Sequence, residues 1–269
     1  MTQKNSLNKH REPRIIAVAN QKGGVGKTTT AVNLATAISA INKKVLIIDL
    51  DPQGNASVSV GLSRLNNGAN AYSVLTGRRR LSDAVSWTKI PNLSLVPASL
   101  DLLGIDIEFA EQENPQFFLK KALKTTPSGY DYIIIDCPPA VGLLTINALV
   151  AADAVIVPIQ CEYLALEGVA DLVKTIEKVK KNFNPGLDIQ GIVLTMFDAR
   201  NNLSDMVASD VRGYFGDKVY NTVIPRNVRV SEAPSHGKPV LLYDWRCPGA
   251  QAYISLAGEM LKREEGICA

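Results

Sequence analysis

The segment Asn20 to Thr29, NQKGGVGKTT, holds residue types that bind phosphate groups. It follows the apolar run Ile15 to Ala19 and precedes a segment with helical periodicity, which is the context that a phosphate-binding loop requires. Glycines let backbone N–H groups approach phosphate oxygens, and the N-terminus of the following helix adds partial positive charge. Lys27 is therefore predicted to reach the β and γ phosphates of a nucleotide, and the Thr28 hydroxyl to coordinate Mg²⁺ directly. The expected nucleotide-binding residues of the loop are Lys22, Gly23, Gly24, Val25, Gly26, Lys27, Thr28 and Thr29.

Two further aspartates stand where apolar runs end. Asp51 lies in the segment DLDPQGN, which follows the run Val45 to Ile48, and Asp136 closes the run Tyr132 to Ile135. The carboxyl ends of parallel strands share one edge of a sheet, so both should face the phosphate loop. A buried carboxylate needs a nearby cation. Asp136 is thus predicted to be a Walker B aspartate that contacts Mg²⁺ through water, while Asp49 is expected to play a structural part.

Positioning these side chains requires several buried strands. Further apolar runs at Ala154 to Ile159 and Gly191 to Met196 are continuous rather than alternating, as expected for strands buried on both faces. Helical periodicity separates the runs, and Ala31, Leu34, Ala35, Ile38 and Ile41 would form one apolar face of the first helix. Further helices are predicted at Pro115–Lys124, Leu143–Ala151, Leu166–Asn182, Leu203–Phe215 and Gly249–Lys262.

Strands that alternate with helices predict the α/β class: a single domain with a twisted, mostly parallel sheet and helices on both faces. We expect a flexible N-terminal tail at residues 1–13 and the domain at residues 14–269. The polar region Gly61 to Ser99 contains one predicted strand, Leu93 to Val96, and is otherwise expected to be a surface excursion from the sheet.

Composition narrows the class of protein. The chain has 269 residues and a net charge of +3, which disfavours binding of polyanions through global charge but leaves room for a local basic patch. The four cysteines are widely spread and do not pair with the two histidines, so a disulfide scaffold or a zinc site is not expected. The polar N-terminus lacks a signal-peptide pattern. The longest uncharged stretch has 16 residues, too few to span a bilayer as a helix. These features predict a cytoplasmic protein.

The phosphate loop departs from the ordinary pattern, because Gln21 stands where a glycine is usual and Lys22 follows it. This KGGVGKTT form is the deviant Walker A motif. Together with DLDPQGN, the segment TMFDAR at 195–200 and the segment VIPRNVRVSEAPSHGKP at 223–239, it resembles the chromosome or plasmid partition ATPases of the ParA/Soj family, within the ParA/MinD group of P-loop NTPases. The resemblance covers Arg14 to Arg263.

The resemblance implies an ATPase that uses ATP and Mg²⁺. It implies that Lys22 reaches across an ATP-dependent homodimer to the partner's phosphates, an arginine-finger role supplied in trans. Asp51 would belong to switch I, contact Mg²⁺ through water and position the attacking water, so that Lys22, Lys27 and Asp51 are the catalytic residues. The segment Pro138 to Gly142 would be switch II. The adenine would be held by Met196, Pro225, Arg226 and Asn227.

The resemblance also implies partners. Arg200 and Arg229 would contact non-specific double-stranded DNA, and a ParB-type DNA-binding protein would stimulate slow ATP hydrolysis. The expected location is the bacterial nucleoid, with no membrane contact. The region Tyr220 to Arg246 has a surplus of only two positive charges, which dimerisation would double.

Other interpretations remain open from the sequence. The phosphate loop could be a simple turn, Asp51 could lie in a solvated Asp-Pro turn, and Lys22 and the arginines could be ordinary surface residues. Arg78 to Arg80 and the stripe Lys174, Lys178, Lys180 and Lys181 are rival basic patches, the stripe being more typical of a solvated face. Cys137 could indicate the nitrogenase iron protein, but a buried thiol is favoured.

A MinD-like protein that cycles on membranes and a ligase of the same fold are alternative functions. The sequence around Glu264-Glu265 disfavours the membrane alternative.

Overall fold

The computed structural model describes residues 12–62, 68–127, 129–163 and 165–266. Most of the predicted tail, residues 1–13, lies outside the described residues. The first strand begins at Arg14, where the domain was predicted to begin.

Within the described residues, eight strands form one sheet in the order β3-β4-β2-β5-β1-β6-β7-β8. Every neighbouring pair is parallel except β3 and β4, which are antiparallel. The predicted mostly parallel sheet is therefore confirmed. The strands are β1 (Arg14–Val18), β2 (Val45–Asp49), β3 (Ser86–Trp87), β4 (Leu93–Val96), β5 (Tyr132–Asp136), β6 (Ala154–Gln160), β7 (Asp188–Phe197) and β8 (Val219–Pro225).

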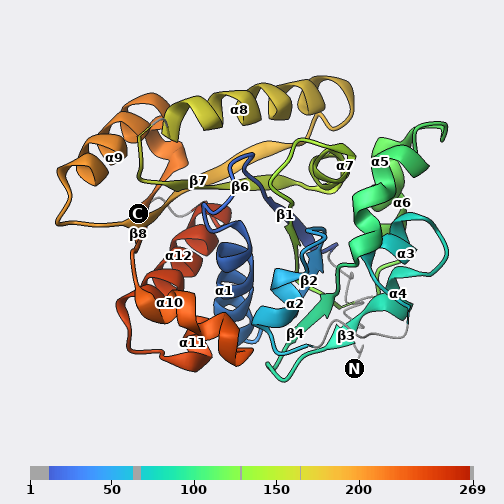
Figure 1. Ribbon diagram of the computed structural model, residues 1–269, viewed down its shortest axis with the longest axis horizontal. Coiled ribbons are helices and arrows are strands. Elements are labelled where there is room, and N and C mark those ends of the chain that lie inside the picture. Colours follow the sequence, from blue (N-terminus) through green and yellow to red (C-terminus); the bar gives the residue numbers. More distant parts are fainter. Residues whose placement is uncertain (1–11, 63–67, 128, 164, 267–269) are drawn as a thin grey trace, which may run out of the picture.

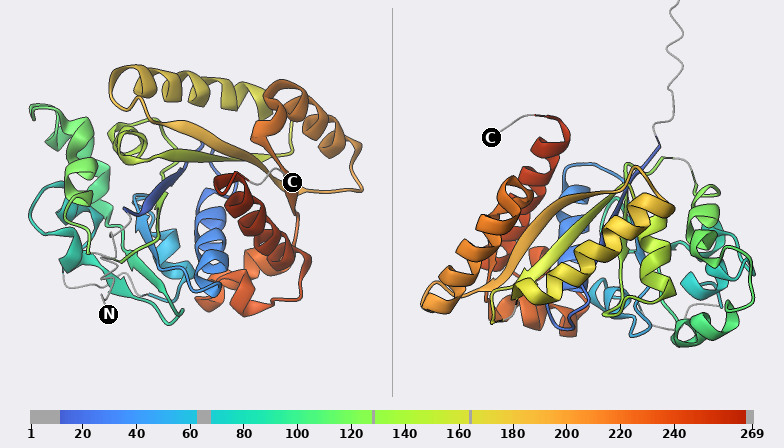
Figure 2. Two further views of the ribbon diagram at one scale, coloured as in Figure 1. Left: turned by 180° about the vertical axis from the view of Figure 1, so that it is seen from behind. Right: turned by 90° about the horizontal axis from the view of Figure 1, so that it is seen from above.

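Helices cover both faces of this sheet (Figures 1 and 2). Side chains on one strand alternate between the faces: Ile16 and Val18 pack in one core cluster, and Ala17 in the other. This alternation explains the continuous apolar runs. The described helices are α1 (Lys27–Ala40), α2 (Asn55–Ser59), α3 (Ala71–Leu75), α4 (Leu81–Ala84), α5 (Ile105–Glu108), α6 (Phe118–Leu123), α7 (Leu143–Ala151), α8 (Ala165–Asn182), α9 (Asn202–Phe215), α10 (Val228–Glu232), α11 (Val240–Tyr243) and α12 (Pro248–Glu264).

Helix α1 differs from the expected amphipathic helix because it is buried on nearly all sides. Helices α11 and α12 pack against it, and α12 lies beside it on the same face of the sheet, where α12 also contacts β8 (Figure 1). The hydroxyls of Thr30 and Tyr253 lie 3.4 Å apart, and Asn33 Oδ1 accepts a hydrogen bond of 2.8 Å from the backbone N–H of Val240. The helix that carries the phosphate loop is therefore enclosed, and its polar residues bond to neighbouring elements.

Two expectations about the sheet are wrong or incomplete. The region Gly61 to Ser99 is not merely a surface excursion: β4 is fully buried beside β2, and α3 and α4 add Val74 and Leu81 to the core. Its apolar residues are spaced among Asn, Gly and Ser, which hides their periodicity.

Strand β8 was not predicted, since Asn221 and Thr222 interrupt its apolar pattern at the edge of the sheet.

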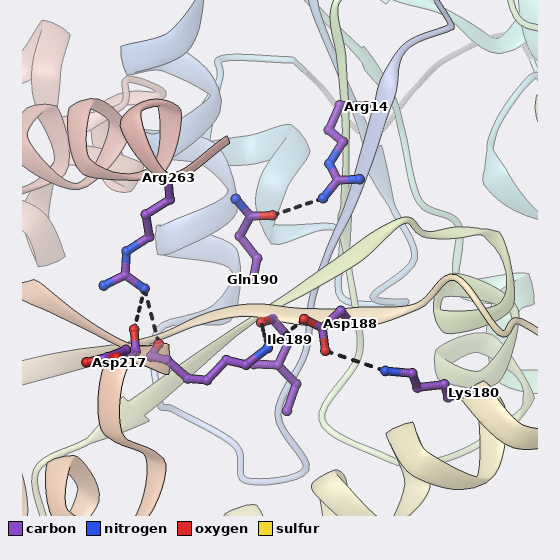
Figure 3. Close-up of polar contacts among 8 residues, drawn as sticks. Arg14, Lys180, Asp188, Ile189, Gln190, Asp217 and Arg263 are labelled. Atoms are coloured by element: carbon purple, nitrogen blue, oxygen red, sulfur yellow. Dashed lines mark hydrogen bonds and ion pairs between the residues drawn. The ribbon is translucent and has the colours of Figure 1, made fainter. Parts of the chain in front are cut away.

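The amino ends of β1 and β7 meet in a polar network on the opposite edge from the phosphate loop. Figure 3 shows Arg14 facing Gln190, whose Oε1 accepts a 3.2 Å hydrogen bond, and Lys180 facing Asp188. The Asp188 carboxylate pairs with Lys180 at 3.7 Å and with Lys218 at 2.5 Å. Lys180 therefore joins α8 to the sheet, while the other three lysines of the stripe are exposed on α8, as predicted for a solvated face.

Candidate nucleotide-binding site

The phosphate loop joins β1 to α1 at the carboxyl edge of the sheet. Gly24 and Gly26 have φ angles of 76° and 88°, in the left-handed region that residues with a Cβ atom rarely adopt. Gly26 is also the N-cap of α1, so the loop turns directly into the helix. The N–H groups of the first turn are thereby left pointing toward the loop, where a phosphate would accept from them.

Two neighbouring strands hold the loop from behind. The Asn20 side chain donates to the carbonyl of Pro158 on β6 at 2.7 Å and accepts from the backbone N–H of Lys22 at 3.0 Å. The Thr195 hydroxyl, on β7, donates to the carbonyl of Val25 at 2.8 Å. These bonds fix the loop before any ligand arrives, which lowers the entropic cost of binding.

Lys27 is folded back into this loop. Its side chain is only 6% exposed, and its Nζ donates to the carbonyl of Lys22 at 2.9 Å. Burial lowers the pKa of Lys27, and the nearby Asp136 carboxylate opposes that shift. Thr28 and Thr29 follow in the first turn of α1, half-buried, and the Thr29 carbonyl accepts from Asn33 at 2.8 Å. The lysine ammonium thus already lies at the loop's centre.

Asp136 and Asp49 end adjacent strands and sit side by side in the β5–β2 register. Burial raises the pKa of Asp136 to about 7, and the Thr28 side chain and Lys27 oppose the shift. Burial and repulsion by Asp136 raise the pKa of Asp49 well above its usual value. Asp49 accepts from the backbone N–H of Asp51 at 3.1 Å, so it anchors the following turn, in keeping with the structural part suggested for it.

Neither carboxylate oxygen of the fully buried Asp136 has a hydrogen-bond partner among the described residues. A carboxylate left in that state is costly unless a cation neutralises it. With the Thr28 hydroxyl beside it, the donor set is one that suits Mg²⁺. Asp51 lies at the same edge, and its Oδ1 accepts from the backbone N–H of Gln53 at 3.0 Å. Cys137, which follows Asp136 in the chain, is a fully buried free thiol, as predicted.

The residues expected to hold adenine lie together at the ends of β7 and β8. Phe197 pairs with Pro225 in the register, and the Arg226 N–H donates to the Phe197 carbonyl at 2.9 Å. Met196 has a φ of 51°, a left-handed conformation that costs about 1–3 kcal/mol and tends to cluster at functional sites. The Asn227 side chain is engaged in capping α10, where its Oδ1 accepts from Arg229 N–H at 3.0 Å.

The structure adds Glu162, which does not stand out in the sequence. Its carboxylate lies 3.5 Å from Lys22 Nζ and 4.0 Å from Arg226, and Gln160 also donates to it. Glu162 follows β6 at the carboxyl edge, so the rule that found Asp51 and Asp136 would have found it too. In the single chain, the unusual lysine of the phosphate loop is therefore held by an acid of the same subunit.

The two arginines assigned to DNA lie on segments that follow β7 and β8, at this same edge. Arg200 is 88% exposed at its side chain and forms a two-pronged contact with Asp198, at 2.9 and 2.8 Å. Arg229 pairs with Glu232 at 3.0 Å and with Asp244 at 3.7 Å. Acidic neighbours thus offset both positive charges, and the basic patch is weaker than its sequence suggests.

The rival patch of residues 78–80 is also partly neutralised. Arg78 pairs with Glu108 at 3.2 Å and lies over the ring of Tyr72, 5.0 Å from its centroid.

The fold and the site together define the class of protein. The sheet is mostly parallel, and its carboxyl edge carries a glycine loop, a buried lysine and a strand-end aspartate without a hydrogen-bond partner in the described part of the chain. This combination is that of the P-loop NTPases.

Comparisons with known proteins give the particular family. A family model described as an AAA domain matches residues 13–189. The chain is 54% identical over 253 residues to the chromosome partitioning protein ParA of Caulobacter vibrioides, covering 93% of this chain and 95% of that protein. It is 51% identical over 247 residues to the sporulation initiation inhibitor protein Soj of Bacillus subtilis, covering 92% and 98%. The chain therefore belongs to the ParA/Soj family of partition ATPases.

A solved structure supports the fold. Cobyrinic acid a,c-diamide synthase from Mycobacterium smegmatis, crystallised with an ATP analog and magnesium, superposes with a TM-score of 0.83 at 36% identity, covering 94% of this chain and 96% of that one. Among the described residues, no helix combines the length and the apolar character needed to cross a membrane.

Proposed function

We propose that this chain is an ATP-dependent DNA-partition protein. Two copies bind ATP and Mg²⁺, close face to face, and bind double-stranded DNA without sequence preference. Hydrolysis, slow alone and stimulated by a ParB-type partner, releases the dimer from the nucleoid. The observation that carries the proposal is the phosphate loop with Lys22 at its start, packed beside the unpartnered Asp136 carboxylate. The identity to partition proteins supports the biological role.

The chain's own residues supply the binding and positioning. The glycine loop and the N-terminus of α1 receive the phosphates, and Lys27 leaves the Lys22 carbonyl to bind the β and γ oxygens. Thr28 would hold Mg²⁺ directly, and Asp51 and Asp136 would hold it through water; the ion would neutralise charge on the phosphates. Among the described residues, no group of three or more His, Cys, Asp or Glu side chains could by itself hold a metal ion.

Replacement of Asp51 by alanine is expected to preserve ATP binding but to slow hydrolysis by about 100-fold or more. This is the usual effect of losing a side chain that orients the attacking water and assists its proton transfer. The variant should therefore accumulate the ATP dimer in size-exclusion chromatography. Asp205→Ala, on the exposed surface of α9, is the matched control and should hydrolyse ATP normally. Normal turnover by Asp51→Ala would remove the role assigned to this aspartate.

Arg200→Glu combined with Arg229→Glu is expected to abolish ATP-dependent retention on random-sequence DNA while the dimer still forms. For each DNA phosphate that is no longer neutralised, the slope of log K against log salt should become shallower by about 0.9. The measurement is DNA binding with ADP, ATP and a non-hydrolysable analogue across a salt series, beside size exclusion.

The control for this double variant is Lys174→Glu with Lys178→Glu, which makes the same change in charge on the exposed face of α8. It should bind DNA like the wild type. Unchanged DNA binding by the arginine variant would redirect attention to Arg78–Arg80, and weaker binding by the lysine control would favour the stripe on α8.

The membrane-cycling alternative has less support. A helix that lies on a membrane needs a free apolar face. The sequence suggested that Ile254, Leu256, Met260 and Leu261 pack on the sheet. In α12, Leu256 and Met260 are fully buried and Leu261 is half-buried, whereas Ile254 is 44% exposed. Most of the apolar side of this helix is therefore occupied within the domain, and Ile254 alone among these four residues is exposed.

A further inference from the structure

Three large apolar side chains stand exposed next to the predicted switch II segment. Leu100 and Leu103 belong to the short 3-10 helix η1 (Leu100–Gly104), and Ile107 lies one turn further, in α5. They are 60%, 68% and 85% exposed. Residues three apart on a 3-10 helix, and four apart on an α-helix, share one side. We name these three residues the exposed ridge. The other side of the same segment is packed in the core through Leu102, Ile105 and Phe109.

The exposed ridge has a strongly acidic rim. Residues 100–114 contain five acidic residues and no lysine or arginine. All five are exposed, and Arg78 pairs with one of them, Glu108, at 3.2 Å. A surface of this charge repels nucleic acid and anionic lipid and attracts cationic partners. The five acids are Asp101, Asp106, Glu108, Glu111 and Glu113.

The exposed ridge is connected to the predicted switch II by a direct bond. Asp106 Oδ1 accepts from the Leu143 N–H, the first residue of α7, at 3.1 Å. The N-cap of α7 is Gly142, which has no side chain to offer, so Asp106 provides the acceptor and its charge suits the helix N-terminus. Figures 1 and 2 show α5 beside α7. A movement of α5 would therefore reach residues 138–142.

We propose that the exposed ridge docks a basic amphipathic helix of a partner protein. The partner's apolar side covers Leu100, Leu103 and Ile107, and its lysines and arginines face the acidic rim. Docking acts on switch II through Asp106. Identifying that partner with the protein that stimulates hydrolysis rests on the proposed function. A second copy of this chain is a poorer occupant, because a symmetric contact would set two acidic rims against each other.

Docking is tested with a short fluorescent helical peptide that has leucines spaced three and four residues apart and lysines between them. Anisotropy across a salt series gives the Kd. Leu103→Ser with Ile107→Ser should weaken binding at least about tenfold, as expected for buried anchor residues. Met206→Ser, at an exposed apolar position on α9, should have no effect. Equal binding by the ridge variant, by a scrambled peptide or by a peptide with glutamates for lysines would overturn the proposal.

The link to switch II is tested by ATP turnover with and without the ParB-type partner. The ridge variant should keep basal turnover and ATP-dependent DNA binding but lose stimulation. Asp106→Ala and Asp106→Asn each remove one of the five rim charges and should weaken peptide binding slightly and to the same extent. Asp106→Ala should lose stimulation, whereas Asp106→Asn, whose carbonyl accepts the same hydrogen bond, should keep it. Loss of stimulation in both Asp106 variants, or in neither, would overturn this link.

The outcomes separate the two proposals. If the wild-type chain neither hydrolyses ATP nor binds DNA, the proposed function fails, while selective peptide binding at the exposed ridge would still support docking. If the wild type performs in full and the ridge variant responds to the partner normally, docking alone fails. An ATP dimer that fails to form in the ridge variant would identify a second copy as the occupant and overturn the proposal.

Discussion

Alanine in place of Lys27 is expected to abolish measurable ATP binding. The ammonium is buried at the centre of the phosphate loop and would make at least two charge-assisted hydrogen bonds to phosphate oxygens. Such bonds contribute about 1.5–3 kcal/mol each, so their loss should weaken binding by about 10²- to 10⁴-fold. Isothermal titration calorimetry with ATP and Mg²⁺ measures this directly.

Part of that loss could arise from the loop itself, because the Lys27 side chain ties to the Lys22 carbonyl at 2.9 Å before a nucleotide binds. A single hydrogen bond to a charged group contributes too little to account for the whole expected effect. Thermal unfolding of the nucleotide-free variant tests for local damage. Lys124→Ala, an exposed lysine on the opposite edge of the sheet, controls for the missing charge. Tight ATP binding by Lys27→Ala would contradict the phosphate-loop assignment.

The phosphate loop was predictable because the residues that bind phosphate are adjacent in the sequence. Asp51 and Asp136 were found by a second rule, that polar residues ending apolar strands meet at one edge of the sheet. The same rule applies to Glu162, but its significance depends on Lys22 and Arg226, which lie 140 and 64 positions away in the chain and meet it only in the folded structure. Pairing between distant segments is what local motifs do not encode.

The helices that touch one another were harder to predict than the strands. The spacing of apolar residues in α1 indicated one buried face, yet α12, more than 200 residues later in the chain, packs beside α1 and buries a further side of it. In the region Gly61 to Ser99, short helices and polar residues hid the core positions. The exposed ridge was missed for a related reason: its leucines and isoleucine look like core residues until the structure shows which side of η1 and α5 faces water.

Lys22→Ala is expected to leave ATP binding by the monomer near normal while reducing partner-stimulated hydrolysis by about 10³-fold or more, the range for a positive charge supplied in trans. In the single chain, Lys22 pairs with Glu162 across 3.5 Å, with both side chains nearly half exposed. An ion pair that is so open to solvent contributes at most about 1 kcal/mol to stability. Lys22 can therefore leave Glu162 at little cost when a second subunit presents phosphates.

Glu162→Gln provides the matched control, because it breaks the same ion pair while keeping Lys22. If Lys22 acts only by holding Glu162, the two variants should share one defect in turnover. If Lys22 acts on the partner's nucleotide, Glu162→Gln should retain stimulated hydrolysis while Lys22→Ala loses it. Mixed dimers sharpen the comparison: a Lys22→Ala subunit that binds ATP should regain hydrolysis at its own site when paired with a subunit that carries Lys22, because the missing charge comes from across the interface.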